Sequence, residues 1–299
     1  MLQADRLVKS FGNHQVLKGI SFVIPEAAIF GLLGPNGSGK TTTVRLLNGL
    51  LTMDSGSASI GGIDVAPQKP DLRRLCGVMT DGANLYDELS GRHNLEFFAE
   101  MFSLKEAKKR CSELLAFFEL EDAAGREVRT YSTGMRKRLM LARALLHKPR
   151  MLFLDEPTSG LDPESALEVN NLIRRLAFED KVTVLLCTHQ LKYAEGLCTS
   201  YGFLDQGEMR ASGTWEELLL SAGQPRFLEL RGSNLQHRSL EQTVDGRWRI
   251  PIESDDGAAL ALRELVENGA NLYDARQTTL SLEDLYFAII AKERGGDAQ

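Results

Sequence analysis

Two short stretches of the sequence carry residue types whose spacing predicts chemistry on a phosphate group. The first, residues 34–41, reads GPNGSGKT and fits the pattern G-x-x-x-x-G-K-[ST] between an apolar run and a helical pattern. Its glycines let the backbone curl so that N–H groups point at phosphate oxygens, and the following helix adds its positive N-terminal end. Lys40 can reach the β- and γ-phosphates, and the Thr41 hydroxyl can bind Mg²⁺.

The second stretch, residues 151–156, reads MLFLDE. Four apolar residues predict a buried strand, and two carboxylates stand at its C-terminal end, where ligands of open α/β sheets bind. Asp155 can hold Mg²⁺ directly or through water, and Glu156 is placed to polarise a water molecule against the γ-phosphate as a general base. Two acidic residues in tandem, in a chain that also has a phosphate loop, are a much stronger signal than one.

The elements that must position these residues alternate between strand and helix. Residues 28–33 form a nearly continuous apolar run, and a helix is predicted from Lys40 to about Leu50. Asp162 and Pro163 predict the start of another helix. Further strands are predicted at residues 2–8, 15–24, 151–154 and 182–187. Such alternation favours an α/β fold with a parallel sheet covered on both faces.

Three other segments complete the predicted organisation. Residues from about 72 to 148 are predicted to be mostly helical, and their basic run Arg136, Lys137 and Arg138 is interpreted as a solvated helix face. Residues 201–211 predict a hairpin, and residues 214–217 a capping box that opens a helix. The pattern breaks after residue 222, so residues 223–299 are predicted to be a small α+β accessory domain. Its strands are expected at 227–231, 248–252 and 272–276, and its helices at 257–268 and 282–292.

The composition limits the classes of function. The chain has 299 residues, is 43% hydrophobic and 25% charged, and carries a net charge of −6, which predicts a soluble globular protein with no nucleic-acid partner. No apolar run approaches the ~20 residues needed to span a bilayer, and no signal peptide is recognised. The four cysteines show no CxxC pairing, which favours reduced thiols. We expect a cytoplasmic protein, with any membrane-spanning part supplied by another chain.

The order of these motifs resembles the nucleotide-binding domain of ABC transporters over roughly residues 2–220. Residues 131–135 (YSTGM) stand at the position of the family's LSGGQ signature, residues 156–163 (EPTSGLDP) match its Walker B exit and D-loop, and His189 matches its switch histidine. The resemblance implies a P-loop NTPase of the ABC type in residues 1–222. Such a domain has a parallel-sheet core, an antiparallel β subdomain and a helical subdomain, here at about residues 72–148.

The resemblance also implies the site. Two copies of the chain sandwich two ATP molecules head to tail, with Mg²⁺ held by Thr41, Asp81 and Asp155. Glu156, His189 and Lys40 are the expected catalytic residues. The expected nucleotide contacts are Phe11 and Val16 beside the adenine, the loop residues Gly34, Pro35, Asn36, Gly37, Ser38, Gly39, Lys40, Thr41 and Thr42, and Ser132, Gly134 and Asp162 from the other copy.

Two parts of the site depart from the family pattern. Asp81 stands where the family usually has Gln, and in the signature Thr133 and Met135 replace a glycine and the glutamine. A β-branched residue at 133 makes a positive φ unlikely there, but Ser132 and Gly134 remain, so we expect the γ-phosphate clamp to survive. Asp81 can still reach Mg²⁺; in the alternative interpretation it points to solvent and a neighbour such as Thr80 takes its place.

Finer details resemble ATPases associated with exporters, the group that includes the daunorubicin-resistance, bacitracin-resistance and sodium-export proteins. These details are residues 84–90 (NLYDELS), 132–136 (STGMR) and 280–287 (LSLEDLYF). They imply an ATP-hydrolysing homodimer bound to a separately encoded permease at the inner face of the cell membrane. The permease is expected to dock near residues 86–96. The transported substrate is not predicted.

Two alternative functions stay open. The first is a soluble ABC ATPase acting on DNA or ribosomes, which the single cassette and the absence of a heptad run or CxxC pair disfavour. The second is a nucleotide-binding regulator with little turnover, which Glu156 disfavours and Asp81 keeps open. For the C-terminal module, a dimerising or stabilising role is favoured over a regulatory ligand site.

Overall fold

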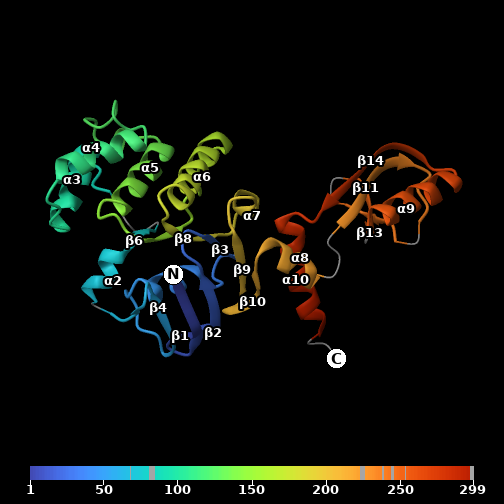
Figure 1. Cartoon of the computed structure of the whole chain (residues 1–299), viewed down its shortest axis with the longest axis horizontal. Helices are drawn as coiled ribbons and strands as arrows, with labels where there is room; N and C mark the ends of the chain where they lie inside the picture. Colours follow the sequence, from blue (N-terminus) through green and yellow to red (C-terminus); the bar gives the residue numbers. More distant parts are fainter. Residues whose placement is uncertain are drawn as a thin grey trace. The chain divides into compact units, whose positions relative to one another are not determined.

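A computed structural model describes residues 1–67, 69–80, 85–222, 226–237, 239–243, 246–252 and 254–296, apart from the side chains of residues 279 and 291–296 (Figure 1). The chain divides into two compact units, Met1–Ser212 and Gly213–Gln299. The second unit begins earlier than the boundary predicted after residue 222, because it includes α8 (Trp215–Ala222), which contacts α10 (Leu282–Gly296) of the same unit.

A six-stranded sheet with the order β10-β9-β3-β8-β7-β6 forms the centre of the first unit. Its strands are β3 (Ile29–Leu33), β6 (Cys76–Met79), β7 (Met151–Asp155), β8 (Thr183–Thr188), β9 (Ser200–Asp205) and β10 (Glu208–Gly213). The five strands from β9 to β6 are parallel. Every residue of β3, β7 and β8 is buried, as expected for central strands of a covered parallel sheet. The hairpin predicted within residues 201–211 is confirmed as neighbouring β9 and β10.

One strand of this sheet was missed by the sequence analysis. β6 lies inside the segment that was predicted to be mostly helical, and it pairs in parallel with β7. The prediction was wrong at this point because a run of four residues is too short for its periodicity to distinguish strand from helix. The strand matters for the site, since its C-terminal end leads to Thr80 and the position of Asp81.

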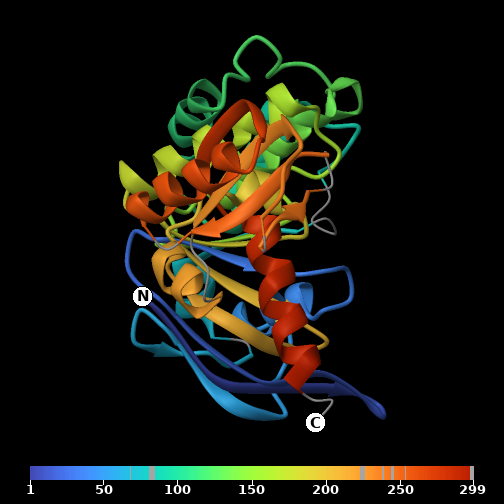
Figure 2. The same ribbon diagram turned by 90° about the vertical axis from the view of Figure 1, so that its right-hand side faces the viewer.

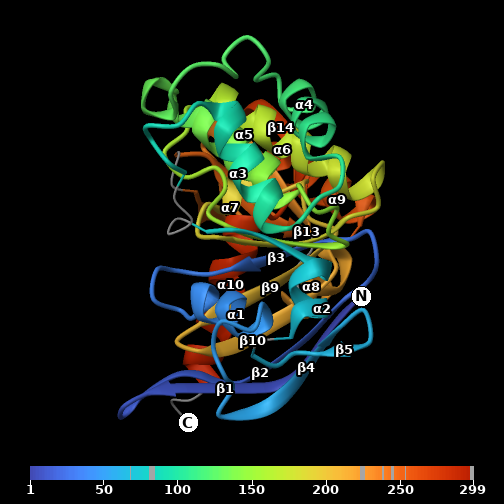
Figure 3. The same cartoon turned by 90° about the vertical axis from the view of Figure 1, so that its left-hand side faces the viewer.

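A second, antiparallel sheet packs against the same core. Its order is β2-β1-β4-β5, with β1 (Leu2–Phe11), β2 (His14–Ile24), β4 (Ser55–Ile60) and β5 (Ile63–Asp64). One buried cluster joins Leu7 and Leu17 of this sheet to Phe30 of β3 and Val44 of α1 (Lys40–Leu47). Figure 3 shows this sheet at one end of the first unit and the helices α3, α4 and α5 at the other.

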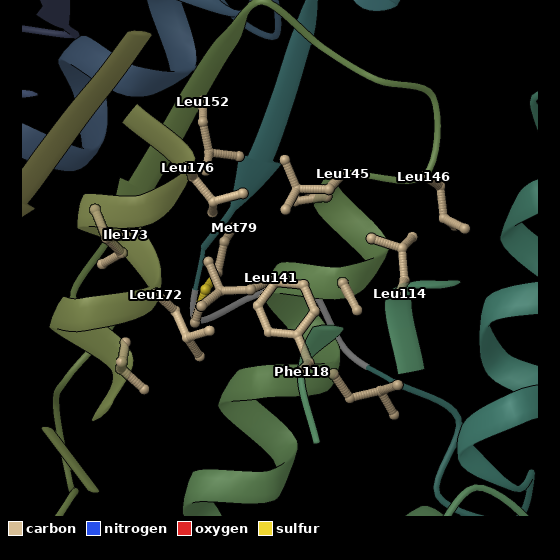
Figure 4. Close-up of a cluster of buried hydrophobic side chains, with 14 of the residues drawn as sticks. Met79, Leu114, Phe118, Leu141, Leu145, Leu146, Leu152, Leu172, Ile173 and Leu176 are labelled. Atoms are coloured by element: carbon tan, nitrogen blue, oxygen red, sulfur yellow. The ribbon is translucent and has the colours of Figure 1, made fainter. Parts of the chain in front are cut away.

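The helical part of the first unit packs against the central sheet through buried apolar side chains. It contains α3 (Gly91–Met101), α4 (Ala107–Phe117), the short η1 (Val128–Thr130) and α5 (Thr133–Ala144). The helix α2 (Pro70–Leu75) precedes β6, and its Leu72 is buried in the cluster of the antiparallel sheet. Figure 4 shows Phe118, Leu141 and Leu145 meeting Met79 of β6 and Leu152 of β7. On the other side of this cluster lie residues of α6 (Pro163–Phe178); α7 (Leu191–Ala194) follows β8.

The second unit is an antiparallel sheet with helices. Its strand order is β12-β13-β11-β14, formed by β11 (Arg226–Ser233), β12 (Glu241–Gln242), β13 (Trp248–Ile252) and β14 (Asn271–Thr279). Leu228, Leu230 and Ile250 pack with Leu265 of α9 (Asp255–Glu267). Figure 2 shows this sheet and the long α10, drawn in red. Apart from the two-residue β12, the elements lie where the sequence pattern predicted strands and helices.

The architecture is the one that the sequence predicted: a parallel-sheet core, an antiparallel β subdomain, a helical subdomain and a small α+β module. All four cysteines are free thiols, and Cys76, Cys111 and Cys187 are buried. In the described part of the chain, no helix combines the length and the apolar character needed to cross a membrane.

Candidate functional site

The phosphate loop connects the end of β3 to the start of α1. Gly37 and Gly39 have φ values of 82° and 113°, which favour glycine. A side chain at Gly39 would place its Cβ 2.6 Å from Leu17 Cδ2, and one at Gly34 would place it 2.0 Å from the Leu204 carbonyl oxygen. α1 begins without a side-chain cap. Its first N–H groups are therefore available to an anion, as a phosphate loop requires.

Lys40 lies at the centre of this loop and is only 6% exposed. Its ammonium donates hydrogen bonds to the main-chain oxygens of Gly34 at 2.7 Å and Pro35 at 2.9 Å. Burial lowers the pKa of Lys40, while the carboxylates of Glu156 and Asp155 act in the opposite direction. The lysine is thus held at the loop by its own backbone and faces the two carboxylates from β7.

Thr41 and Asp155 bring together the two oxygen donors expected at Mg²⁺. The Thr41 hydroxyl donates to Asp155 Oδ2 at 2.7 Å, and Asp155 is 6% exposed. Neighbouring ligands of an octahedral Mg²⁺ are separated by about 3 Å, so a hydroxyl and a carboxylate at this spacing fit the ion. Among the described residues, no three His, Cys, Asp or Glu side chains gather as a metal site.

Glu156, the first residue after β7, is held through both its carboxylate and its main chain. Thr188 Oγ1 donates to Oε2 at 2.9 Å and the His189 N–H donates to Oε1 at 3.0 Å. His189 Nδ1 lies 2.7 Å from the same Oε1, within hydrogen-bond distance. The main-chain N–H donates to the Cys187 oxygen at 2.8 Å.

The backbone of Glu156 is strained. Its φ is 51°, a left-handed conformation that costs a residue with a side chain about 1–2 kcal/mol. Such strain persists only where surrounding contacts fix it, and it concentrates at functional sites. The strained turn directs the carboxylate toward Thr188 and His189 at the end of β8, beside the phosphate loop.

A cavity of about 440 Å³ lies against these groups. It is lined by residues from β2, the phosphate loop, α1 and the ends of β6 and β7: Val16, Asn36, Gly37, Gly39, Lys40, Thr41, Thr42, Arg45, Thr80, Asp155 and Glu156. The structure therefore brings together two cations, Lys40 and Arg45, two carboxylates and the start of a helix at the carboxyl ends of parallel strands. This arrangement can bind a chain of phosphates, hold Mg²⁺ and present a base to water.

The signature residues lie outside the lining of this cavity. Ser132 caps α5, where its Oγ accepts from the Met135 N–H at 3.2 Å, and Thr133 is the first residue of α5, so it avoids the positive φ that a β-branched side chain disfavours. Asp162 caps α6 and accepts from the Ser165 N–H at 3.0 Å, which lowers the pKa of Asp162. The side chains of Ser132 and Asp162 are exposed, and Gly134 is buried next to Ser165.

Two other predicted site residues need separate mention. Phe11 is 47% exposed, with the Lys9 ammonium 5.6 Å from the centre of its ring, and it does not line the cavity. Asp81 lies outside the described residues. Thr80, its alternative at the metal, does line the cavity.

The sequence analysis missed two residues that contact Glu156. Thr188 was not singled out as a site residue. Lys137 was interpreted as part of a solvated helix face, but it is 8% exposed and donates to the Glu156 carbonyl oxygen at 3.0 Å. Gly134, Lys137, Leu141 and Ala144 recur at helical spacing on one buried face of α5. This periodicity was overlooked because Lys137 stands in a run of three basic residues.

The fold and the site define a P-loop ATPase, and comparisons with known proteins give its family. Residues 17–159 match the family model described as "ABC transporter". The chain is 41% identical to the daunorubicin resistance ATP-binding protein DrrA2 of Streptomyces coeruleorubidus, over 96% of this chain and 94% of that protein. It is 37% identical to the linearmycin resistance ATP-binding protein LnrL of Bacillus subtilis, over 80% and 78% respectively.

A solved relative extends the comparison to structure. The dimeric post-hydrolysis state of the ATP-binding cassette MJ0796, bound to ADP and Pi, has a TM-score of 0.65 and 26% identity, over 72% of this chain and 98% of that one. The chain therefore belongs to the ABC transporter ATP-binding proteins. It is an ATP-binding subunit of this family and hydrolyses ATP, and its relatives include exporter-type proteins.

Proposed function

We propose that this chain hydrolyses Mg-ATP between two copies of itself and thereby powers export by a separately encoded membrane permease. The observation that supports this most strongly is the cluster of Lys40, Thr41, Asp155 and Glu156 around one cavity. The names of the linearmycin and daunorubicin resistance relatives favour export of a compound out of the cell. In this proposal the chain is cytoplasmic and reaches the membrane through the permease.

The residues divide the chemistry between binding and proton transfer. Lys40 and the first N–H groups of α1 bind the β- and γ-phosphates, and Val16 lies beside the adenine. Thr41 and Asp155 hold Mg²⁺, which supplies positive charge at the phosphates. Glu156 accepts a proton from the attacking water, and His189 orients the Glu156 carboxylate through the contact of 2.7 Å. Asp81 or Thr80 completes the metal shell.

The second copy supplies the groups that one copy lacks at its cavity. Ser132 and Asp162 lie at exposed starts of α5 and α6, away from the cavity lining. The Ser132 hydroxyl accepts from Met135 N–H and can at the same time donate its own proton to a γ-phosphate. A head-to-tail dimer places this donor on the partner's ATP, and the dimeric solved relative supports such an assembly.

The docking surface for the permease is proposed at residues 86–96, before and along α3. Tyr86 is 46% exposed and packs edge-on against Phe97, which is 41% exposed. Exposed aromatic side chains are common at protein interfaces. Asp87 connects this surface to the signature helix, since its carboxylate lies 2.6 Å from the Arg136 guanidinium. A permease bound here is therefore linked to α5.

Copurification of the permease with the tagged chain tests this proposal. Glu88 is exposed, so Glu88→Lys reverses a charge on the surface, whereas Asp87→Lys also breaks the ion pair with Arg136. We expect Glu88→Lys to weaken copurification or uncouple transport while basal ATPase activity stays unchanged. Glu121→Lys, at an exposed acidic residue of the same subdomain, is the matched control. Crosslinks from the permease only to residues 226–299 would contradict the docking surface.

A further inference from the structure

Lys137 is a buried cation on the signature helix whose ammonium reaches the catalytic turn. It is 8% exposed, and Nζ donates to the main-chain oxygen of Glu156 at 3.0 Å. A buried ammonium requires hydrogen-bond acceptors, so this carbonyl is part of what makes its burial possible. Arg136 pairs with Asp87, and Arg138 lies near Glu119 and Glu168. Of these three basic residues, Lys137 is the one hydrogen-bonded to the Glu156 backbone.

The contact falls on a strained peptide unit. Glu156 has a φ of 51°, and its carbonyl accepts from Lys137 and, at 3.3 Å, from the Ser159 N–H. A charged donor forms a stronger hydrogen bond than a neutral one, so Lys137 is the stronger of these two constraints on the carbonyl. The carbonyl and the side chain belong to the same residue. A hydrogen bond that fixes the Glu156 main chain therefore also fixes the position from which its side chain extends.

The helix that carries Lys137 also carries the signature. Ser132 caps α5, and Lys137 follows five residues later, about 7–8 Å along the helix axis. α5 also contacts α6, which follows Glu156 in the chain after the D-loop. One helix therefore connects the group offered to the other copy's ATP with the backbone of its own catalytic carboxylate.

We infer that Lys137 is a positioning residue for Glu156: it holds the strained backbone of the catalytic glutamate and couples it to α5, the helix that presents Ser132. The inference rests on the proposed function of Glu156 as the base and of Ser132 at the partner's ATP. Lys137 acts on turnover through Glu156 and leaves the binding of ATP to Lys40 and α1 unchanged.

Steady-state ATPase activity and ATP affinity, measured separately, test this inference. Lys137→Met keeps the length of the side chain and removes the ammonium; we expect kcat to fall roughly 10–100-fold, since small displacements of a catalytic group have effects of this size. The Kd for ATP should stay unchanged. Lys137→Arg, which can still donate to the carbonyl, should regain most of the lost kcat. Arg138→Met, one residue along the same helix, is the matched control and should keep wild-type kcat.

A double substitution separates positioning from a general structural effect. If Lys137 acts through the carboxylate, adding Lys137→Met to Glu156→Gln should not lower turnover further. An equal further loss in that background, a wild-type kcat in Lys137→Met, or no rescue by Arg would each overturn the inference. If Lys137→Met does not fold, Lys137→Gln, a shorter neutral donor, replaces it. The kcat of Lys137→Gln should be lower than that of wild-type and Lys137→Arg and higher than that of Glu156→Gln. Full turnover in Glu156→Gln alone would instead refute the proposed base.

Discussion

The helix that starts at the phosphate loop and the helices that start at the signature and D-loop differ in how their first N–H groups are satisfied. α1 begins at Lys40 without a side-chain cap, whereas Ser132 and Asp162 cap α5 and α6 with hydrogen bonds of 3.2 and 3.0 Å. An uncapped start keeps its N–H donors for an anion, and a capped start has already used one of them. The phosphate loop of a single chain thus has free N–H donors for a bound phosphate.

The signature side has a different character. Ser132 and Asp162 are exposed and lie outside the cavity lining, while Lys40 and Asp155 are each only 6% exposed. The buried half of the site, which includes Lys40 and Asp155, is held by contacts within the chain, so its geometry does not depend on a partner. The exposed half offers short side chains on rigid helix starts. Under the proposed function, this difference makes binding and catalysis separable: one chain binds the nucleotide, and a second copy completes the site.

The largest expected effect is at the base in the buried half. In Glu156→Gln, turnover should fall ~10²–10⁴-fold because base catalysis contributes about this much, while ATP affinity is retained. The amide still fits between Thr188 and His189. Hydrolysis assays and a sizing column with ATP measure the two effects, and an ATP-dependent dimer should accumulate. Wild-type turnover in this variant would remove Glu156 from the catalytic role.

Lys40→Ala tests the other function of the buried half. The substitution removes the charged donor of the loop, and the affinity for ATP should fall about 100-fold or more, since hydrogen bonds to charged groups contribute about 1.5–3 kcal/mol each. Titration of a fluorescent ATP analogue measures the affinity. Lys109→Ala, at a lysine whose side chain is 70% exposed, is the control and should bind normally. Undiminished affinity in Lys40→Ala would mean that the loop does not hold the phosphates.

Ser132 in the exposed half should respond differently from Lys40. Ser132→Ala removes one donor to the partner's γ-phosphate, so we expect turnover to fall roughly 10–100-fold with unchanged ATP affinity of the single chain. The substitution also removes a helix cap, at a cost of about 1 kcal/mol in stability. Ser254→Ala removes a comparable cap from α9, where Ser254 Oγ accepts from the Gly257 N–H at 3.1 Å. Equal ATPase activity in the two variants would leave Ser132 with only its capping role.

That the residues of the buried half lie close together could be expected from the sequence, because parallel topology brings strand ends together. Lys40 follows β3, Glu156 follows β7 and His189 follows β8, so three motifs far apart in sequence meet at one edge of the sheet. The phosphate loop could be identified because all its residues lie in one contiguous motif. The fold was predictable for the same reason, since each buried strand is a short apolar run.

Other features depend on tertiary packing that local patterns do not contain. β6 has four residues, too few for a periodicity, and it is recognised as a strand only through its pairing with β7. Lys137 stands between two arginines, and its burial follows from which face of α5 packs inward. The strained φ of Glu156 is likewise set by the turn between β7 and its neighbours, and nothing in the residue type predicts it.

The smallest expected effect concerns Asp81, which the structure does not describe and whose role therefore rests on the sequence. The family's Gln offers a neutral amide, whereas Asp81 offers a carboxylate that binds a hard cation more strongly but lacks a donor. If Asp81 is a ligand, Asp81→Ala should raise the Mg²⁺ concentration for half-maximal ATPase several-fold, and Asp81→Gln should retain substantial activity.

Thr80 provides the matched comparison for Asp81, because it lines the cavity beside Thr41 and Asp155. Thr80→Val keeps the branched shape of the side chain and removes the hydroxyl, so it tests whether this neighbour completes the metal shell. A Mg²⁺ titration that shifts in Asp81→Ala and not in Thr80→Val places Asp81 at the metal. The reverse result assigns that role to Thr80, and Asp81 then adds no negative charge beside the γ-phosphate. In either case the metal ligands come from the same chain as Lys40, so both variants should bind ATP as single chains once Mg²⁺ is saturating.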